Sequence, residues 1–148
     1  MKNENYLRTQ EVRKDLHAQF TMLEVFLTGW YACRDKHYSR PEELDAQYLE
    51  LVGALMGGPQ GPGLLQLMIE QSMDHLLSRL RADLPYLKPR EVLIFSYSVA
   101  GFSNALAGNL LGISTVHAAV LKTRLKHAIQ ACHSPRKALF LSMLPDNS

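Results

Sequence analysis

The N-terminal third of the chain carries a helical rhythm of apolar residues. They recur every three or four positions from Val12 to Cys33 and predict one long amphipathic helix from about Asn5 to His37. A helix of about 30 residues greatly exceeds the mean of about 11 to 12 and often supports a bundle or a dimer. We therefore expect its apolar seam to join two copies of the chain through four side chains: Leu16, Leu23, Phe26 and Trp30.

Two further helices are predicted before residue 85. Ser39, Pro41 and Glu42 have the spacing of a capping box with a helix-compatible proline, so a helix is expected from there to about Met56. The glycines and prolines of residues 57–63 then predict a turn region. The next helix is expected from about Leu64 to Ala82, with a buried side made of Leu65, Met68, Ile69, Met73, Leu76, Leu77 and Leu80.

The C-terminal part is predicted to hold a cluster of shorter helices. The first runs from Pro89 to Ala100 and ends at a glycine. A short helix then follows the N-cap Ser103 and closes at Gly112, and Ser114 caps a longer helix over about residues 115–131. No window shows the strict alternation of a strand, so the predicted fold class is all-α. A short helix, a glycine-containing turn and a longer helix follow each other in the order of a helix-turn-helix. We therefore expect a long N-terminal helix, a helical bundle and a C-terminal helix-turn-helix.

Charge divides the chain into two parts. Residues 1–85 hold nine Lys or Arg and twelve Asp or Glu, a net of −3, whereas residues 86–148 hold seven and two, a net of +5. A basic segment joined to a mildly acidic one indicates an anionic partner, although a solubilising surface gives the same balance. We expect a helical dimerisation or signal-transmission region over 1–85 and a helix-turn-helix domain over 86–148.

Basic residues of the last long helix and the segment after it are the candidate DNA contacts. At about 100° per residue, Lys122 and Lys126 share one face, and Arg124 lies about 160° to 200° from each. No acidic residue lies between Glu91 and Asp146 to repel phosphates. Because the first turn offers no Arg, Asn or Gln to the bases, direct base readout is expected to be weak. The candidates are Ser114, Thr115 and His117 near the bases, Lys122, Arg124 and Lys126 at phosphates, and Arg136 and Lys137 at the flank.

Several stretches of this segment resemble a known family. The runs 87–93 (LKPREVL), 100–104 (AGFSN) and 111–114 (LGIS) look like the LuxR-type helix-turn-helix and the related promoter-reading domain of sigma factors. A group of bacterial membrane-anchored regulators with tetratricopeptide repeats is a closer match, through 73–85, the basic run 122–126 and the apolar run 137–141. The resemblance covers about residues 64–144 and implies a cytoplasmic output segment of a longer regulator. It departs from the family at 105–108 (ALAG), where Gly108 stands inside a helix, and at 117–121, where apolar residues precede the basic run.

Other chemistry finds little support in the sequence. The two cysteines, Cys33 and Cys132, make neither a disulfide framework nor a zinc site by themselves, and no cofactor is expected. No Ser/His/Asp or Cys/His arrangement stands out, so we expect no enzyme. No apolar run approaches the roughly 18 residues of a membrane span, so we expect a cytoplasmic location and no membrane contact by this segment, which is compatible with a fragment of a longer, membrane-anchored protein.

The sequence therefore leaves two alternative functions open. The first is a DNA-binding output module of a transcriptional regulator, dimerised through its N-terminal helices and binding DNA in a salt-dependent way. The alternative is a helical dimerisation or signalling module that binds protein and has lost DNA binding. The alternative draws on the apolar run from Ala118 to Leu121 in the recognition helix.

Overall fold

The described part of the computed structural model comprises residues 2–35, 57–58 and 61–145. These residues are all-α apart from a two-residue ladder, in which β1 (Gly57–Gly58) pairs antiparallel with β2 (Gly61–Pro62). The ladder falls in the predicted turn region, and the helix expected over 39–56 lies outside the described residues.

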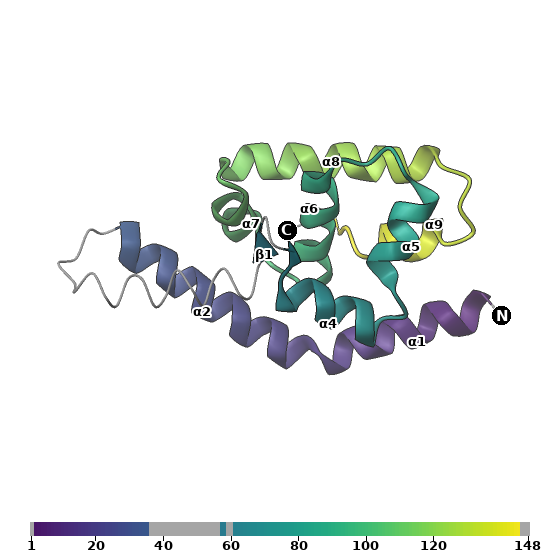
Figure 1. Ribbon diagram of the computed structural model, residues 1–148, viewed down its shortest axis with the longest axis horizontal. Helices are drawn as coiled ribbons and strands as arrows, with labels where there is room; N and C mark the ends of the chain where they lie inside the picture. Colours follow the sequence, from purple (N-terminus) through teal and green to yellow (C-terminus); the bar gives the residue numbers. More distant parts are fainter. Residues whose placement is uncertain (1, 36–56, 59–60, 146–148) are drawn as a thin grey trace.

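Two helices form the N-terminal third, α1 (Lys2–Asp15) and α2 (His17–Asp35). The single helix predicted from Asn5 to His37 is thus divided at Leu16. The division is slight, because Leu16 N–H still donates to Val12 O and Phe20 N–H to Leu16 O, both at 3.0 Å. Together the two helices run along one side of the molecule and carry the other helices on one face (Figure 1).

The helix predicted from Leu64 to Ala82 is wrong in one respect, because it is two helices. They are α4 (Leu64–Ser72) and α5 (Leu76–Asp83), and the break lies at residues 73–75. Asp74 and His75 there have φ of 54° and 56°, the left-handed region that ordinary residues rarely adopt. Six of the seven residues predicted for the apolar side, Leu65, Ile69, Met73, Leu76, Leu77 and Leu80, are buried, and Met68 is half-buried against the core.

Four more helices follow in the described part of the chain, and sequence signals predicted the ends of the first three. They are α6 (Pro89–Val99), α7 (Asn104–Leu111), α8 (Thr115–Ala131) and α9 (Lys137–Ser142). Gly101 and Gly112 have φ of 80° and 72°, as expected of glycines that end helices. The Ser103 hydroxyl accepts from Leu106 N–H at 3.1 Å, which confirms its role as N-cap of α7.

One hydrophobic core joins both parts of the chain. Phe20 and Leu27 of α2 belong to the same buried cluster as Phe95 of α6 and Leu125 of α8. In Figure 1, α6 stands between α1–α2 on one side and α8 on the other. The long N-terminal helices are therefore packed on the C-terminal helices and leave one side of α8 open.

Candidate nucleic-acid interface

The corner between α7 and α8 is tight. The two helices are bent by 98° across a three-residue turn, and Ile113 N–H donates to Gly108 O at 2.9 Å. A Cβ on Gly108 would lie only 2.7 Å from Ile113 O and 3.1 Å from Ser114 O. Glycine is an unfavourable residue inside a helix, but at position 108 the absence of a Cβ leaves room for the backbone of the turn to pass close to α7.

The first turn of α8 is held by Ser114 and projects outward. The Ser114 hydroxyl accepts from His117 N–H at 3.0 Å and so satisfies one of the unbonded N–H groups of the helix start. Thr115, Val116 and His117 are exposed, and Val116 keeps 73% of its surface open. Ser114 therefore positions this turn, whereas the next three side chains are available to a partner.

The buried side of α8 is defined by Ala118, Leu121, Leu125 and Ile129. The side turned away from the core is neutral along most of its length, because Val120, Thr123 and His127 are exposed there. Arg124 is the exposed cation on this side. The outward face of α8 is therefore more apolar and less basic than the sequence suggested.

Lys122 lies elsewhere than the sequence predicted. Its residue surface is only 6% exposed, and it lines a cavity together with Arg13, Glu24 and Ser98. Burial lowers the pKa of Lys122, and the nearby Lys126 lowers it further. As a correction, Lys122 does not stand on the open surface of α8, and only the half-buried Lys126 and the exposed Arg124 remain there from the predicted trio.

Arg136 is engaged inside the chain. Its Nη2 lies 2.8 Å from Asp83 Oδ1 and its Nε 3.1 Å from Asp83 Oδ2, a two-pronged ion pair that ties the end of α5 to the start of α9. Ser134 donates its hydroxyl to the same carboxylate. Arg136 therefore ties α5 to α9 within the chain, and Lys137 beside it is half-buried.

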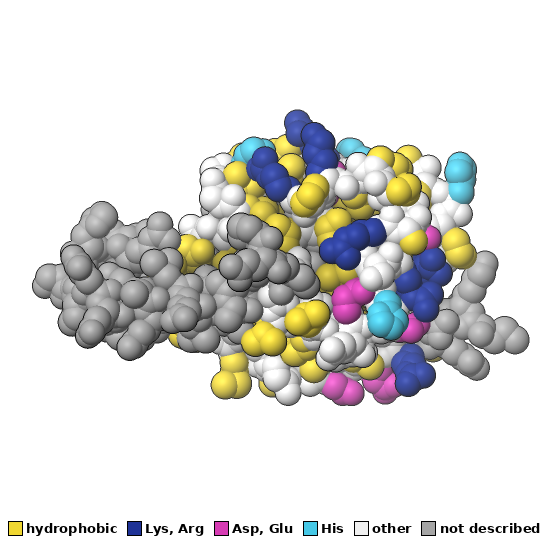
Figure 2. Space-filling view, viewed as in Figure 1, with side chains coloured by type: hydrophobic (Ala, Val, Ile, Leu, Met, Phe, Trp, Pro, Cys, Tyr) yellow, Lys and Arg dark blue, Asp and Glu magenta, His cyan; other side chains and the backbone are white. Residues whose placement is uncertain are grey.

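Two basic residues outside the predicted set belong to this side of the molecule. Lys88 and Arg90 flank Pro89 at the start of α6, the helix that packs under α8, and both are exposed. In Figure 2, some Lys and Arg side chains project over α8, and others lie farther down the same face, near the Asp and Glu side chains. The sequence offered part of this signal, because a proline at the first helical position marks a helix start and so places Lys88 and Arg90 beside it.

The four residues predicted to join two copies are occupied within the chain. Leu16, Leu23 and Phe26 are half-buried against the core, and Trp30 is 6% exposed, with its ring 4.8 Å from that of Tyr31 in an edge-to-face contact. Within a single chain, these four side chains therefore pack against other residues of the same chain, where contacts with a second copy were expected.

Charged side chains fix α1 and α2 on the corner between α6 and α7. Arg13 donates from Nε to Val99 O and from Nη2 to Ser98 O, both at 2.9 Å, at the C-terminal end of α6. Glu24 accepts from Ser103 N–H at 2.8 Å, at the N-terminal end of α7. A cation at a helix C-terminus and an anion at an N-terminus each complement the helix dipole.

Other kinds of site find no geometry in the part of the chain that the structure describes. No three His, Cys, Asp or Glu residues lie together there as metal ligands would. No single helix there has the length and apolar character needed to cross a membrane, and α7 with α8 reaches that level only as a pair across its 98° bend. Comparisons with protein-family models, curated proteins and solved structures give no match.

Proposed function

We propose that the chain is a DNA-binding module of a transcriptional regulator, with α7 and α8 as a helix-turn-helix of the LuxR and sigma-factor type. The observation that carries the proposal is the outward face of α8, which is open along its length beyond a 98° corner. Helix-turn-helix units meet at about 90° to 120° and place the second helix in the major groove. The resemblance in sequence supports the same assignment.

The exposed residues divide between positioning and readout. Arg124 and Lys126 on α8 and Lys88 and Arg90 at the start of α6 would contact phosphates, which supply most of the affinity but no sequence information. Val116 offers its methyl groups to thymine methyls, and Thr115 and His117 offer the only hydrogen-bonding groups of the first turn. We infer modest base readout and a strong salt dependence.

A homodimer is part of this proposal. One helix-turn-helix provides little affinity alone, and dimers that read two half-sites are the usual remedy. Light scattering coupled to size exclusion, with and without duplex DNA, measures the number of copies. A single copy in both cases contradicts the dimer but leaves monomeric DNA binding to the test below.

A second function, binding of a protein partner through the same face, is favoured by one observation. Val116 and Val120 are 73% and 40% exposed and lie one turn apart on α8. Exposed apolar residues on one helical face are typical of helix-mediated protein contacts. This second function predicts that the chain does not bind DNA through α8 at any salt concentration.

Fluorescence anisotropy with mixed-sequence duplex DNA at about 50 and 200 mM salt separates the two functions. The double variant Arg124→Ala/Lys126→Ala should weaken binding and reduce its salt slope by about two, one for each phosphate that is no longer neutralised. The matched control is Arg8→Ala/Lys14→Ala, which removes the same charge from exposed positions on α1. No binding by the folded chain, or equal weakening in the two variants, contradicts the DNA proposal.

A further inference from the structure

The outward face of α8 has a centre line of side chains that carry methyl groups. Val116, Val120 and Thr123 are exposed and lie at positions i, i+4 and i+7, within about 60° of one another around the helix axis. This set, the methyl stripe, lies about 180° from the buried side of α8. In Figure 1, α8 follows the upper edge of the molecule and α6 lies on its inner side. The methyl stripe is therefore the part of α8 that a bound partner would contact most directly.

The methyl stripe offers little hydrogen bonding. Its two valines are 73% and 40% exposed. The Thr123 hydroxyl donates to Ala119 O at 3.1 Å, so its proton is used within the helix. Thr115 and His117 can form hydrogen bonds, but they lie about 100° from Val116, one on each side. Contacts along the centre line of α8 are therefore contacts through methyl groups.

Basic side chains flank the methyl stripe on both sides. Arg124 lies roughly 70° to one side of it and Lys126 roughly 90° to the other. The helix contains no Asp or Glu. The major groove of DNA has the complementary form, because phosphates line its two edges, base edges lie between them, and its width of about 12 Å admits an α-helix. Charge therefore favours DNA as the partner that covers the stripe.

Among the bases, thymine offers the group that matches a methyl stripe. It displays its C5-methyl in the major groove, whereas guanine displays two acceptors there and cytosine an amino donor. Contact between methyl groups removes apolar surface from water, which is favourable. A valine against a G·C pair would instead shield polar atoms without bonding to them. From Val116 to Thr123 the helix rises about 10 Å, the height of about three base pairs.

We propose that the methyl stripe recognises thymine, so that the chain prefers duplexes whose thymine methyl groups line the major groove over about three successive base pairs. This inference rests on the proposed DNA binding and names the class of sequence that the same face would bind. Arg124 and Lys126 would contact phosphates, and the stripe would supply the preference among sequences.

Fluorescence anisotropy of the whole chain with two otherwise identical A·T-rich duplexes tests this inference. One duplex contains thymidine, and in the other deoxyuridine replaces every thymidine, which removes the C5-methyl and keeps every base-pairing group and phosphate. The chain should bind the thymine duplex about tenfold more tightly, since each of three covered methyl groups contributes about two- to fourfold. Because the contact is uncharged, the ratio should be the same at about 50 and 200 mM salt, while both affinities fall as salt rises.

The variant Val116→Ala/Val120→Ala removes methyl groups from the stripe. It should reduce the thymine preference to about two- to fourfold, the share of Thr123. Both valines are exposed and alanine favours helix, so the fold should be retained, which the melting temperature checks. The matched control is Met22→Ala/Val25→Ala, which removes apolar groups from two positions of α2 that are 72% and 66% exposed, and it should keep the full preference.

The outcomes separate this inference from the proposed function. Equal binding of the two duplexes, or a preference that survives unchanged in Val116→Ala/Val120→Ala, overturns the recognition of thymine and leaves DNA binding in place. If the folded chain binds neither duplex at either salt concentration, both proposals are overturned and the methyl stripe is assigned to a protein partner.

Discussion

The α7–α8 turn and the α4–α5 turn both contain left-handed backbone, but different kinds of residue adopt it. Between α7 and α8 the chain bends by 98° through Gly112 at φ 72°, and Gly108 lets the turn lie close to the preceding helix. Between α4 and α5 the chain also uses left-handed backbone, but the residues are Asp74 and His75. The first turn follows from residues that permit the geometry, whereas the second needs outside help to impose it.

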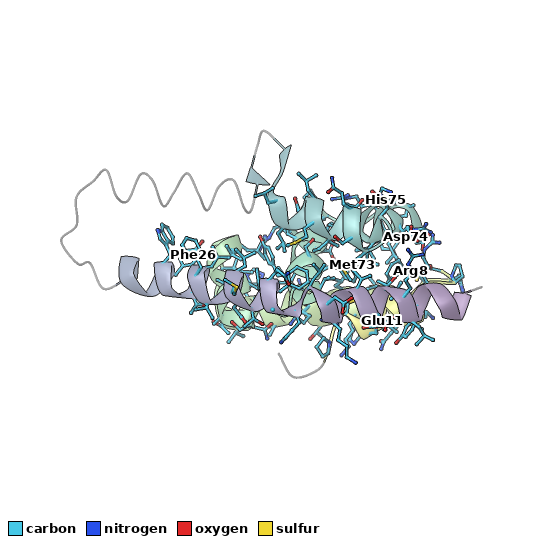
Figure 3. The ribbon with its side chains drawn as sticks, turned by 90° about the horizontal axis from the view of Figure 1, so that it is seen from below. Arg8, Glu11, Phe26, Met73, Asp74 and His75 are labelled. Carbon is cyan, nitrogen blue, oxygen red and sulfur yellow. The ribbon has the colours of Figure 1, made fainter. Side chains whose placement is uncertain are left out.

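The second turn is held mainly by the carboxylate of Glu70, with a further contact from Arg79. Glu70, at the end of α4, accepts from Leu77 N–H at 2.6 Å and from Ser78 N–H at 3.0 Å, and the Ser78 hydroxyl donates to it as well. Arg79 adds a bond from Nε to Asp74 O at 2.7 Å. Figure 3 shows Asp74 and His75 at this turn, with Arg8 of α1 close by and Met73 turned toward the core. A strained turn is thus maintained by bonds to the start of the next helix.

The largest effect is expected at the glycine turn. Gly108→Ala should lower the free energy of unfolding by about 3 kcal/mol, because its Cβ would meet backbone that cannot move aside. Urea denaturation measures the change as a shift of the midpoint at constant slope. Gly29→Ala is the control, since a Cβ there meets nothing within 4 Å, and it should raise stability by about 1 kcal/mol. Equal signs for the two variants would refute the close-approach argument.

The next effect belongs to the imposed turn. Glu70→Gln should destabilise the chain by about 1 to 2 kcal/mol, because the amide keeps the size of the side chain but weakens the cap of α5. The control Glu11→Gln changes an exposed carboxylate on α1 and should shift the urea midpoint little. If the two variants behave alike, the carboxylate of Glu70 is not what maintains the turn.

A smaller loss of stability is expected where only backbone conformation is at stake. Gly112→Ala should cost about 1 kcal/mol, the usual penalty of left-handed backbone for a residue with a Cβ. A Cβ on Gly112 meets nothing within 4 Å, so the comparison with Gly108→Ala separates conformational cost from steric conflict. A destabilisation as large as that of Gly108→Ala would show that the two costs cannot be separated here.

The smallest effect has the opposite sign. His75→Gly should raise the free energy of unfolding by about 0.5 kcal/mol, since relief of the left-handed strain exceeds the added chain entropy. The histidine is exposed, and its Nδ1 lies 3.9 Å from Glu70 Oε2, so the side chain contributes little to stability. A drop in melting temperature would mean that His75 stabilises the turn in spite of its backbone.

The sequence predicted the parts of the fold that depend on local residue types. The 3.6-residue rhythm and the caps predicted the bounds of α6, α7 and α8 nearly to the residue. The reason is that Ser103, Gly112 and Ser114 act locally, through hydrogen bonds to nearby N–H groups or through their own backbone conformation. The break after Ser72 was not predictable in this way. It depends on Glu70 reaching across seven residues to Leu77 N–H, and the apolar spacing continues through the break.

The candidate site was predicted only in part, for a related reason. Helix periodicity showed that Lys122 and Arg124 face different ways, but it did not show which of the two faces the core. That depends on tertiary partners, and Lys122 is buried beside the distant Arg13 and Glu24. The ion pair of Arg136 could not be predicted from local sequence for the same reason, because its partner Asp83 lies 53 residues earlier in the chain.

The contacts of Arg13 and Glu24 have a consequence for how the protein can be recombined. A different N-terminal segment grafted onto the C-terminal helices would have to bring an arginine and a glutamate at these two places, eleven residues apart on neighbouring helices. Without them, the carbonyl groups that end α6 and the N–H group that begins α7 would lose their partners. Chimeras joined before Arg13 keep both contacts, those joined between α1 and α2 keep only that of Glu24, and those joined after residue 35 keep neither, so the exchangeable unit is longer than the C-terminal helices.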